Sequence, residues 1–178
     1  MAALLVNCLI VFVYGTCIGS FLNVCIYRIP LGISVVAPAS HCPTCGHRIR
    51  WYDNIPILSY FLLRGKCRDC GCLISPRYAG VEFLTAALLT LVFCKYGVSL
   101  ASVVYMALTA ALIVCSFIDI DLFIIPDKIT YPGMATGLLL GLVTSFAFSR
   151  EGLLVTGWKE ALIGFLVGGG SLYVMGLI

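Results

Sequence analysis

The sequence has little charge, since only 11% of its 178 residues are Asp, Glu, Lys or Arg. Hydrophobic residues make up 61% of the chain, well above their share in soluble domains, and this excludes a soluble, secreted or disordered protein. Internal repeats and low-complexity tracts are also lacking. The net charge is only +3, and the basic residues gather in one segment of an apolar chain, which membrane topology explains better than nucleic-acid binding does. The composition therefore predicts a membrane protein with no nucleic-acid partner.

Five apolar stretches are long enough, or nearly so, to cross a lipid bilayer as helices, which takes about 20 residues. They run over residues 3–27, 78–94, 99–118, 131–148 and 159–178. The first stretch lacks the basic start of a signal peptide, so we expect a retained span. Within it, Gly15 and Gly19 have a spacing that would let another helix approach closely. The sequence thus predicts an all-α polytopic membrane protein with about five transmembrane helices.

The distribution of basic residues predicts the orientation of the chain. Seven of the eleven lie between Arg28 and Arg77, where the only acids are Asp53 and Asp69. Because Lys and Arg are enriched in cytoplasmic loops, this segment is expected in the cytoplasm and the N-terminus outside. The expected division of the chain is residues 1–27 for the first transmembrane helix, 28–80 for a small cytoplasmic insert and 81–178 for the remaining transmembrane part.

Two Cys-x-x-Cys pairs stand in this insert, Cys42 with Cys45 and Cys67 with Cys70. A Gly follows each pair and lets the chain turn tightly, so that backbone amides can face the sulfur atoms. Two such knuckles supply four thiolates for a tetrahedral zinc ion, and a segment of ~50 residues has too little core to fold easily without a metal. Four sulfur ligands leave no position open for a substrate, so the predicted zinc is structural.

Two disulfides or unliganded thiols are the alternative for these four cysteines, but the cytoplasm keeps thiols reduced. Cys72 is a fifth thiol outside the motif, and we expect it to be dispensable. His41 and His47 flank the first pair, but the four cysteines already complete the zinc shell. The remaining cysteines lie in or beside apolar stretches and are expected to pack as small hydrophobic residues: Cys8, Cys17, Cys25, Cys94 and Cys115.

Three carboxylates follow the third apolar stretch, at Asp119, Asp121 and Asp127. Asp119 directly continues the apolar helix, and an ionisable residue at the edge of a span is a candidate functional residue. Positions two apart on a helix point to different faces, so Asp119 and Asp121 are not expected to form a catalytic pair. Asp127 follows Pro126 and is expected in the first turn of the next helix, where a negative charge is favoured. Glu82 is expected to have an interfacial or helix-start role.

Taken together, these motifs resemble the bacterial type IV prepilin peptidases, which are leader peptidases and N-methyltransferases of the GxGD aspartyl class. The resemblance runs along almost the whole chain, and its motifs occur in the family's order. They are GSFLNV at 19–24, YRIP at 27–30, SHCPTCG at 40–46, WYDNIP at 51–56, GKCR at 65–68, IS at 74–75, RY at 77–78 and DIDLFIIPDKIT at 119–130.

The resemblance implies a multi-pass protease of the bacterial cytoplasmic membrane that serves type IV pilus and type II secretion systems. Such enzymes remove the leader of prepilins and pseudopilins after a Gly at the cytoplasmic face, and then methylate the new N-terminus with S-adenosylmethionine. By motif position, the resemblance assigns the first catalytic aspartate to Asp119 and the zinc ligands to Cys42, Cys45, Cys67 and Cys70. It assigns no residue to the methyl donor, and it leaves the individual substrate and the oligomeric state open.

The sequence departs from the family pattern in one respect. The family's second aspartate belongs to a Gly-x-Gly-Asp motif, and no such motif occurs in these 178 residues, where Gly168-Gly169-Gly170 precedes Ser171. We therefore expect residues 81–178 to form an incomplete aspartyl peptidase domain, and the chain to be an N-terminal portion or a truncated form that is inactive alone. Two other classes stay open: a non-catalytic, zinc-stabilised membrane adaptor, and a membrane thiol oxidoreductase that uses Cys-x-x-Cys.

Overall fold

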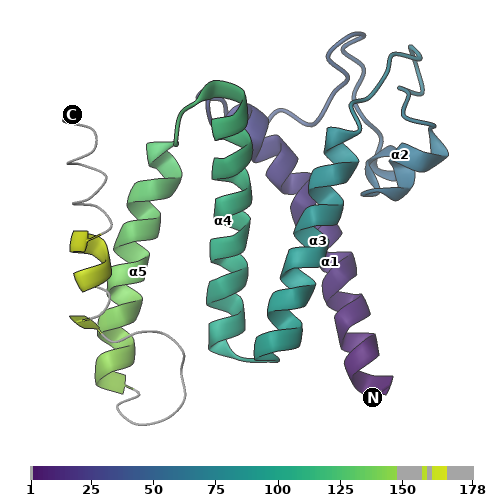
Figure 1. Ribbon diagram of the computed structural model, residues 1–178. Coiled ribbons are helices and arrows are strands. Elements are labelled where there is room, and N and C mark those ends of the chain that lie inside the picture. Colours follow the sequence, from purple (N-terminus) through teal and green to yellow (C-terminus); the bar gives the residue numbers. More distant parts are fainter. Residues whose placement is uncertain (1, 148–157, 160–161, 168–178) are drawn as a thin grey trace. The chain divides into compact units, whose positions relative to one another are not determined.

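The computed structural model describes residues 2–147, 158–159 and 162–167 (Figure 1). Within these residues every regular element is a helix, and the extended pairing is limited to two isolated β-bridges. The chain divides into two compact units, residues 1–126 and 127–178, which are described separately.

Three long helices form most of the first unit: α1 (Ala2–Arg28), α3 (Arg77–Tyr96) and α4 (Leu100–Leu122). Within the described residues, these three helices are long and apolar enough to cross a membrane. They correspond to the first three predicted stretches, and α4 continues four residues beyond the predicted end at residue 118. The first unit is therefore the helical, polytopic structure that the composition predicts.

Helices α1 and α3 pack closely against each other, and two glycines of α1 allow it. A Cβ atom on Gly15 would lie 2.7 Å from the Cα of Ala86, and one on Gly19 would lie 2.6 Å from the Cα of Glu82. Real Cβ atoms do not approach a neighbouring backbone so closely, so only Gly fits at both positions. The close helix approach that the glycine spacing predicts is confirmed.

A short turn joins α3 to α4. Gly97 ends α3 with a positive φ of 60°, a conformation that costs a glycine little. The hydroxyl of Ser99 accepts a hydrogen bond from the backbone N–H of Ser102 at 3.1 Å and so caps the start of α4. The rings of Tyr96 and Tyr105 stack across the turn with their centroids 4.7 Å apart. These contacts hold α3 and α4 as antiparallel neighbours.

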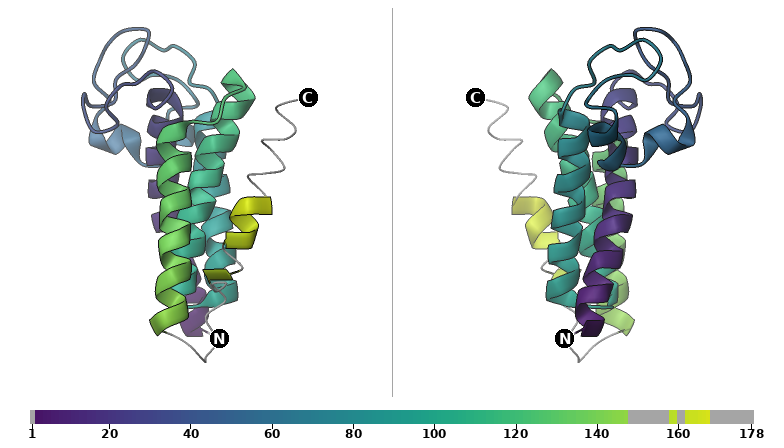
Figure 2. Two further views of the ribbon diagram at one scale, coloured as in Figure 1. Left: turned by 90° about the vertical axis from the view of Figure 1, so that its left-hand side faces the viewer. Right: turned by 90° about the vertical axis from the view of Figure 1, so that its right-hand side faces the viewer.

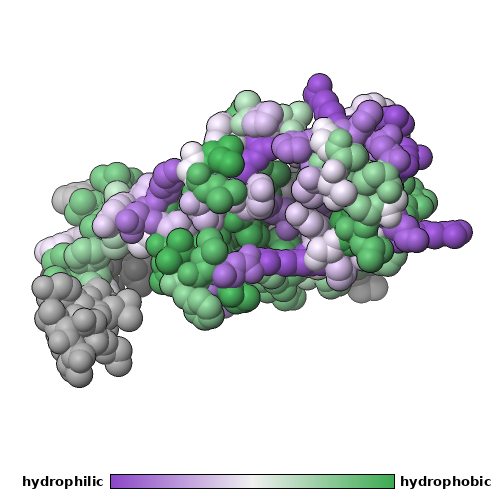
Figure 3. Space-filling model, turned by 90° about the horizontal axis from the view of Figure 1, so that it is seen from above, coloured by the Kyte–Doolittle hydropathy of each residue, from purple (hydrophilic) through white to green (hydrophobic). Residues whose placement is uncertain are grey.

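An insert of residues 29–76 separates α1 from α3. It contains the short 3₁₀ helix η1 (Trp51–Asn54) and the five-residue helix α2 (Leu58–Leu62). Its loops rise beyond the ends of α1 and α3, whereas α2 lies beside the bundle (Figures 1 and 2). Seen from above, hydrophilic and hydrophobic side chains are interspersed over the top of the molecule (Figure 3).

Two buried side chains of the long helices hold this insert. Arg28, at the end of α1, donates hydrogen bonds to the carbonyl oxygens of Ser34 and Pro38 at 3.0 and 2.8 Å. Glu82 of α3 accepts a hydrogen bond from the backbone N–H of Ile57 at 2.6 Å. Charged groups are rarely buried without partners, and here the backbone of the insert supplies the partners.

In the second unit, α5 (Asp127–Ala147) corresponds to the predicted stretch 131–148 but begins four residues earlier. The earlier start has a physical reason, because Asp127 places a carboxylate in the first turn, where the helix dipole favours it. The predicted position of Asp127 is thus confirmed. Most of the fifth predicted stretch, residues 159–178, lies outside the described residues.

Candidate functional site

Two matching knuckles stand in the insert at the predicted Cys-x-x-Cys motifs. The backbone N–H of Gly46 donates to the carbonyl of Cys42, and that of Gly71 donates to the carbonyl of Cys67, both at 2.9 Å. The two glycines have φ values of 70° and 71°, which favour residues without a side chain. An isolated β-bridge closes each knuckle. Both motifs therefore fold into the same turn, and each turn directs its two thiols toward those of the other.

The four cysteines of the motifs come together in space. The sulfur atoms of Cys42, Cys45, Cys67 and Cys70 all lie within 4.8 Å of one another, and those of Cys42 and Cys70 are 3.9 Å apart. A zinc ion bonded at about 2.3 Å to four tetrahedral thiolates separates the sulfur atoms by about 3.8 Å, so this cluster could hold zinc. The backbone N–H groups of Cys45 and then Thr44 lower the pKa of the Cys42 thiol to about 6, which favours the thiolate that a metal requires.

The neighbouring candidate ligands lie outside this cluster of four. The Sγ of Cys72 lies 3.5 Å from the Sγ of Cys42, closer than the sequence spacing suggests, but Cys72 is not one of the four mutually close thiols. His41 and His47 are exposed, and the Nδ1 of His41 lies 3.3 Å from the carbonyl oxygen of Ala39. That Cys72 is dispensable for metal binding stays a prediction.

Ion pairs tie η1 and its preceding residue Arg50 to the second knuckle, and the sequence alone does not predict them. The guanidinium of Arg68 donates three hydrogen bonds of 2.6 to 3.0 Å to the carboxylate of Asp53, whose side chain is only 9% exposed. This pairing holds the pKa of the Asp53 carboxyl below its ordinary value. Arg50 lies 3.6 Å from Asp69, and the guanidinium groups of Arg50 and Arg68 both lie within 6.0 Å of the Tyr52 ring. These contacts cross from one motif to the other, so no single motif predicts them.

The two carboxylates of α4 have different surroundings. Asp121 forms a 2.7 Å ion pair with Arg77 at the start of α3, and Arg77 also donates to the carbonyl oxygen of Phe117. The side chain of Asp119 is exposed, and among the described residues no hydrogen bond or ion pair to its carboxylate is found. The left-handed Phe123, with a φ of 55°, ends α4 through a hydrogen bond to the carbonyl of Asp119. The two side chains therefore do not form a pair with each other, as expected from their spacing.

The helix-start role expected as one possibility for Glu82 is wrong. Glu82 is the sixth residue of α3, and the first turn of that helix contains no acidic residue. Its side chain is buried between the helices, where it accepts the hydrogen bond from Ile57. No pattern in the sequence predicts this contact, because its two partners are 25 residues apart and come from different parts of the chain.

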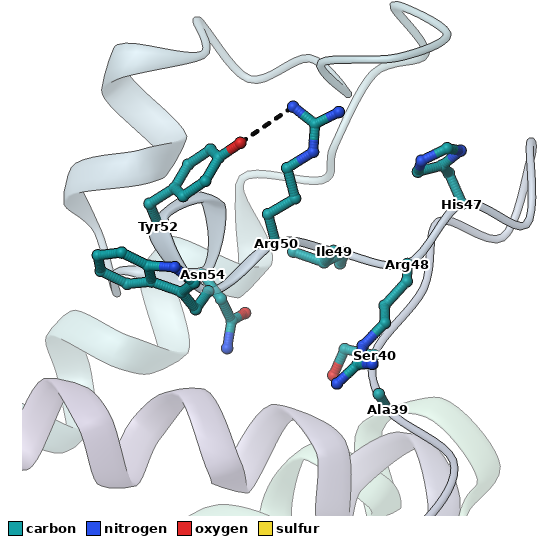
Figure 4. Close-up of a pocket in the computed structure, with 9 residues that line it drawn as sticks. Ala39, Ser40, His47, Arg48, Ile49, Arg50, Tyr52 and Asn54 are labelled. Atoms are coloured by element: carbon teal, nitrogen blue, oxygen red, sulfur yellow. Dashed lines mark hydrogen bonds between the residues drawn. The ribbon is translucent and has the colours of Figure 1, made fainter.

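A hollow of about 560 Å³ lies on the insert next to the first knuckle (Figure 4). His47, Arg48 and Arg50 contribute cationic or titratable groups to its lining, and Arg50 donates a 3.0 Å hydrogen bond to the hydroxyl of Tyr52. The sequence alone does not predict this hollow, because its walls come from loop and η1 residues with no common spacing.

Comparison with known proteins gives two consecutive family matches. The model for the bacterial peptidase A24 N-terminal domain matches residues 13–96, and the model for the type IV leader peptidase family matches residues 106–178. The first match includes the four-cysteine cluster, and the second includes Asp119. No solved structure matches the chain.

Curated relatives carry consistent names. Proteins named prepilin leader peptidase/N-methyltransferase are 43% identical over 155 residues in Myxococcus xanthus and 41% identical over 150 residues in Pseudomonas putida. These alignments cover 87% and 72% of this chain but only 45% and 52% of the relatives, so the chain spans about half the length of the curated relatives it matches. A Neisseria gonorrhoeae protein of the same name is 38% identical over 92% of this chain and 62% of its own length. The family models and the relatives agree, and the chain is similar over most of its length to proteins of the type IV leader peptidase family.

Proposed function

We propose that this chain supplies a catalytic aspartate, Asp119, and a structural zinc site to a prepilin peptidase. The enzyme cleaves the leader of type IV prepilins or pseudopilins after a Gly, next to the hydrophobic segment that follows, and then methylates the new N-terminus. The methyl donor is S-adenosylmethionine. The names of the relatives support both activities, and no residue of this chain is assigned to the methyl donor.

The two carboxylates of α4 differ in their surroundings, and this difference supports the proposal. Asp121 is paired with Arg77, whereas Asp119 presents an exposed carboxylate at the same end of the helix. An aspartyl protease needs a carboxylate that can share a proton with a second carboxylate, and an ion pair with Arg would keep a carboxylate ionised. Asp119 meets this requirement and Asp121 does not.

In the proposed mechanism, Asp119 shares one proton with the aspartate of the family's Gly-x-Gly-Asp motif. Two carboxylates so close cannot both ionise, so one is protonated while the other is charged. The charged member accepts a proton from a water molecule as that water attacks the peptide carbonyl, and the protonated member donates to the carbonyl oxygen. The proton belongs to the pair, so neither role is assigned permanently to Asp119.

The proposed zinc ligands are Cys42, Cys45, Cys67 and Cys70, and zinc supplies folding energy to the insert. The proposed topology has the N-terminus outside the cytoplasmic membrane of a bacterium and the insert in the cytoplasm. The seven basic residues between Arg28 and Arg77 support this orientation. The Arg77–Asp121 ion pair joins the end of α4 to the start of α3, so in this topology Asp119 is on the same side of the membrane as the insert.

Prepilin cleavage in isolated membranes tests the proposal. The protein is produced with a family-like Gly-x-Gly-Asp segment and its following spans after residue 178, in a host without a prepilin peptidase of its own. Asp119→Asn should abolish the gel shift of the prepilin, because an amide cannot exchange the proton. The Asp121→Asn variant is the matched control on the same helix, and it should cleave prepilin more slowly but measurably. Asp127→Asn should reduce the cleavage rate less than Asp121→Asn does.

Zinc content should be the same in all of these variants, which would show that the insert is folded. Cleavage by the Asp119→Asn variant at the rate of the unmodified protein would contradict the proposed role of Asp119. The 178 residues alone are expected not to cleave prepilin, and cleavage by this chain in purified form would show that the second catalytic group lies within it.

A further inference from the structure

Two cysteines face each other at the end of the α1–α3 pair that is opposite to the insert. The Sγ atoms of Cys8 on α1 and Cys94 on α3 are 3.3 Å apart, although the residues are 86 positions apart in the chain. Cys94 lies two residues before the end of α3, and Cys8 lies four residues after the first residue of the apolar span of α1. At a rise of 1.5 Å per residue, both lie within about 6 Å of the ends of their spans, within reach of the aqueous phase.

The register of the two helices places these cysteines together independently of their side-chain conformations. Gly15 of α1 lies against Ala86 of α3, and four residues further along α1, Gly19 lies against Glu82. In both antiparallel pairs the residue numbers add up to 101. Continuing this register for seven residues toward the N-terminus brings Cys8 opposite residue 93, next to Cys94.

We propose that Cys8 and Cys94 form a disulfide at the outer face of the membrane. The proposal rests on the topology given under the proposed function, in which the N-terminus and the α3–α4 turn are outside. Disulfides form and persist in the bacterial periplasm, whereas thiols on the cytoplasmic side are kept reduced. The same chain thus uses its cysteines in two ways: the thiols of the insert bind metal, and the pair at the opposite end cross-links α1 to α3.

The reaction is an ordinary thiol–disulfide exchange with a periplasmic disulfide oxidant. The thiolate of one cysteine attacks the disulfide of the oxidant, and the thiolate of the other cysteine then displaces the reduced oxidant from the mixed disulfide. One S–S bond forms in this chain and one breaks in the oxidant. The two cysteines lose two protons and two electrons, and the oxidant takes up both electrons as it becomes a dithiol.

Peptide mapping of the unmodified chain tests the proposal without any variant. Intact bacterial cells are treated with a membrane-permeant alkylating reagent before lysis to block free thiols, and the protein is then digested and analysed by mass spectrometry without reduction. The expected result is a cross-linked pair of peptides containing Cys8 and Cys94, with alkyl groups on Cys17 of α1 and Cys115 of α4. On a non-reducing gel, the closed loop should make the protein migrate faster than its reduced form.

Variants then assign the cross-link. Cys94→Ser should migrate identically with and without reductant, whereas the matched control Cys17→Ser should keep the shift. Alkyl groups on both Cys8 and Cys94 in the mapped protein would overturn the proposal, and so would a Cys94–Cys94 link between two copies. Because prepilin cleavage is measured separately with Asp119→Asn, a missing disulfide would leave the proposed activity standing, and loss of the activity would leave the disulfide standing.

Discussion

Replacing Gly19 by Ala should destabilise the α1–α3 pair. The new Cβ would lie 2.6 Å from the Cα of Glu82, whereas carbon atoms in contact are separated by about 3.5–4.0 Å. The obstacle is backbone and not a flexible side chain, so the helices must separate locally by about 1 Å. Overpacking of this kind costs about 1–3 kcal/mol. The measurement is reversible unfolding in detergent micelles, followed by far-UV circular dichroism as SDS is added.

Gly80→Ala is the matched control for this experiment. Gly80 lies in α3, in a helical conformation, and a Cβ there would meet nothing within 4 Å. Ala at this position should therefore leave the free energy of unfolding unchanged, or raise it by up to about 1 kcal/mol through its better helix propensity. If the Gly19→Ala variant unfolds at the same SDS concentration as the Gly80→Ala variant, the close approach of α1 and α3 is wrong.

The insert and its orientation give three further expectations. Purified protein should contain about one zinc ion per chain, and full zinc occupancy in a Cys42→Ser/Cys67→Ser double variant would contradict the four-thiolate site. A cysteine reagent that cannot cross membranes should leave engineered cysteines at 31–76 unlabelled in intact cells and label those at 150–157, whereas the reverse pattern would refute the orientation. Because pairing lowers the pKa of Asp53, its contribution to stability is present above the ordinary aspartate pKa of about 3.9 and is lost as pH falls through the lower folded-state value. Asp53→Asn should therefore be less stable than the unmodified protein at neutral pH, with the difference narrowing in acid, and a difference independent of pH would contradict the ion pair.

Local patterns in the sequence were enough to predict the long helices and the cysteine cluster. Apolar length sets where a helix can cross a membrane, and two motifs of the same Cys-x-x-Cys-Gly pattern bring their thiols together by making the same turn twice. Gly19 and Gly80 show what such local patterns cannot predict. Both are glycines of apolar helices, and only the packing of α1 against α3 reveals that one is required and the other is free to change.

The contacts that hold the insert and the end of α4 could not be predicted in this way. Arg77 and Asp121 are 44 residues apart, and Glu82 and Ile57 are 25 residues apart. Neither pair has a spacing that a helix or turn would make meaningful, so each contact depends on how three helices assemble. The catalytic role of Asp119 stays a prediction.

Helix α3 takes part in both of these long-range contacts, so the insert and the end of α4 are attached to the same helix. Through Glu82 it fixes the height of the insert along the bundle, and through Arg77 it fixes the end of α4 that bears Asp119. The two attachment points are five residues apart, about 7.5 Å along the helix. The spacing between these two attachment points is therefore set within a single helix. A tilt of α3 in a bilayer of different thickness would therefore move the attachment points of the insert and of α4 together.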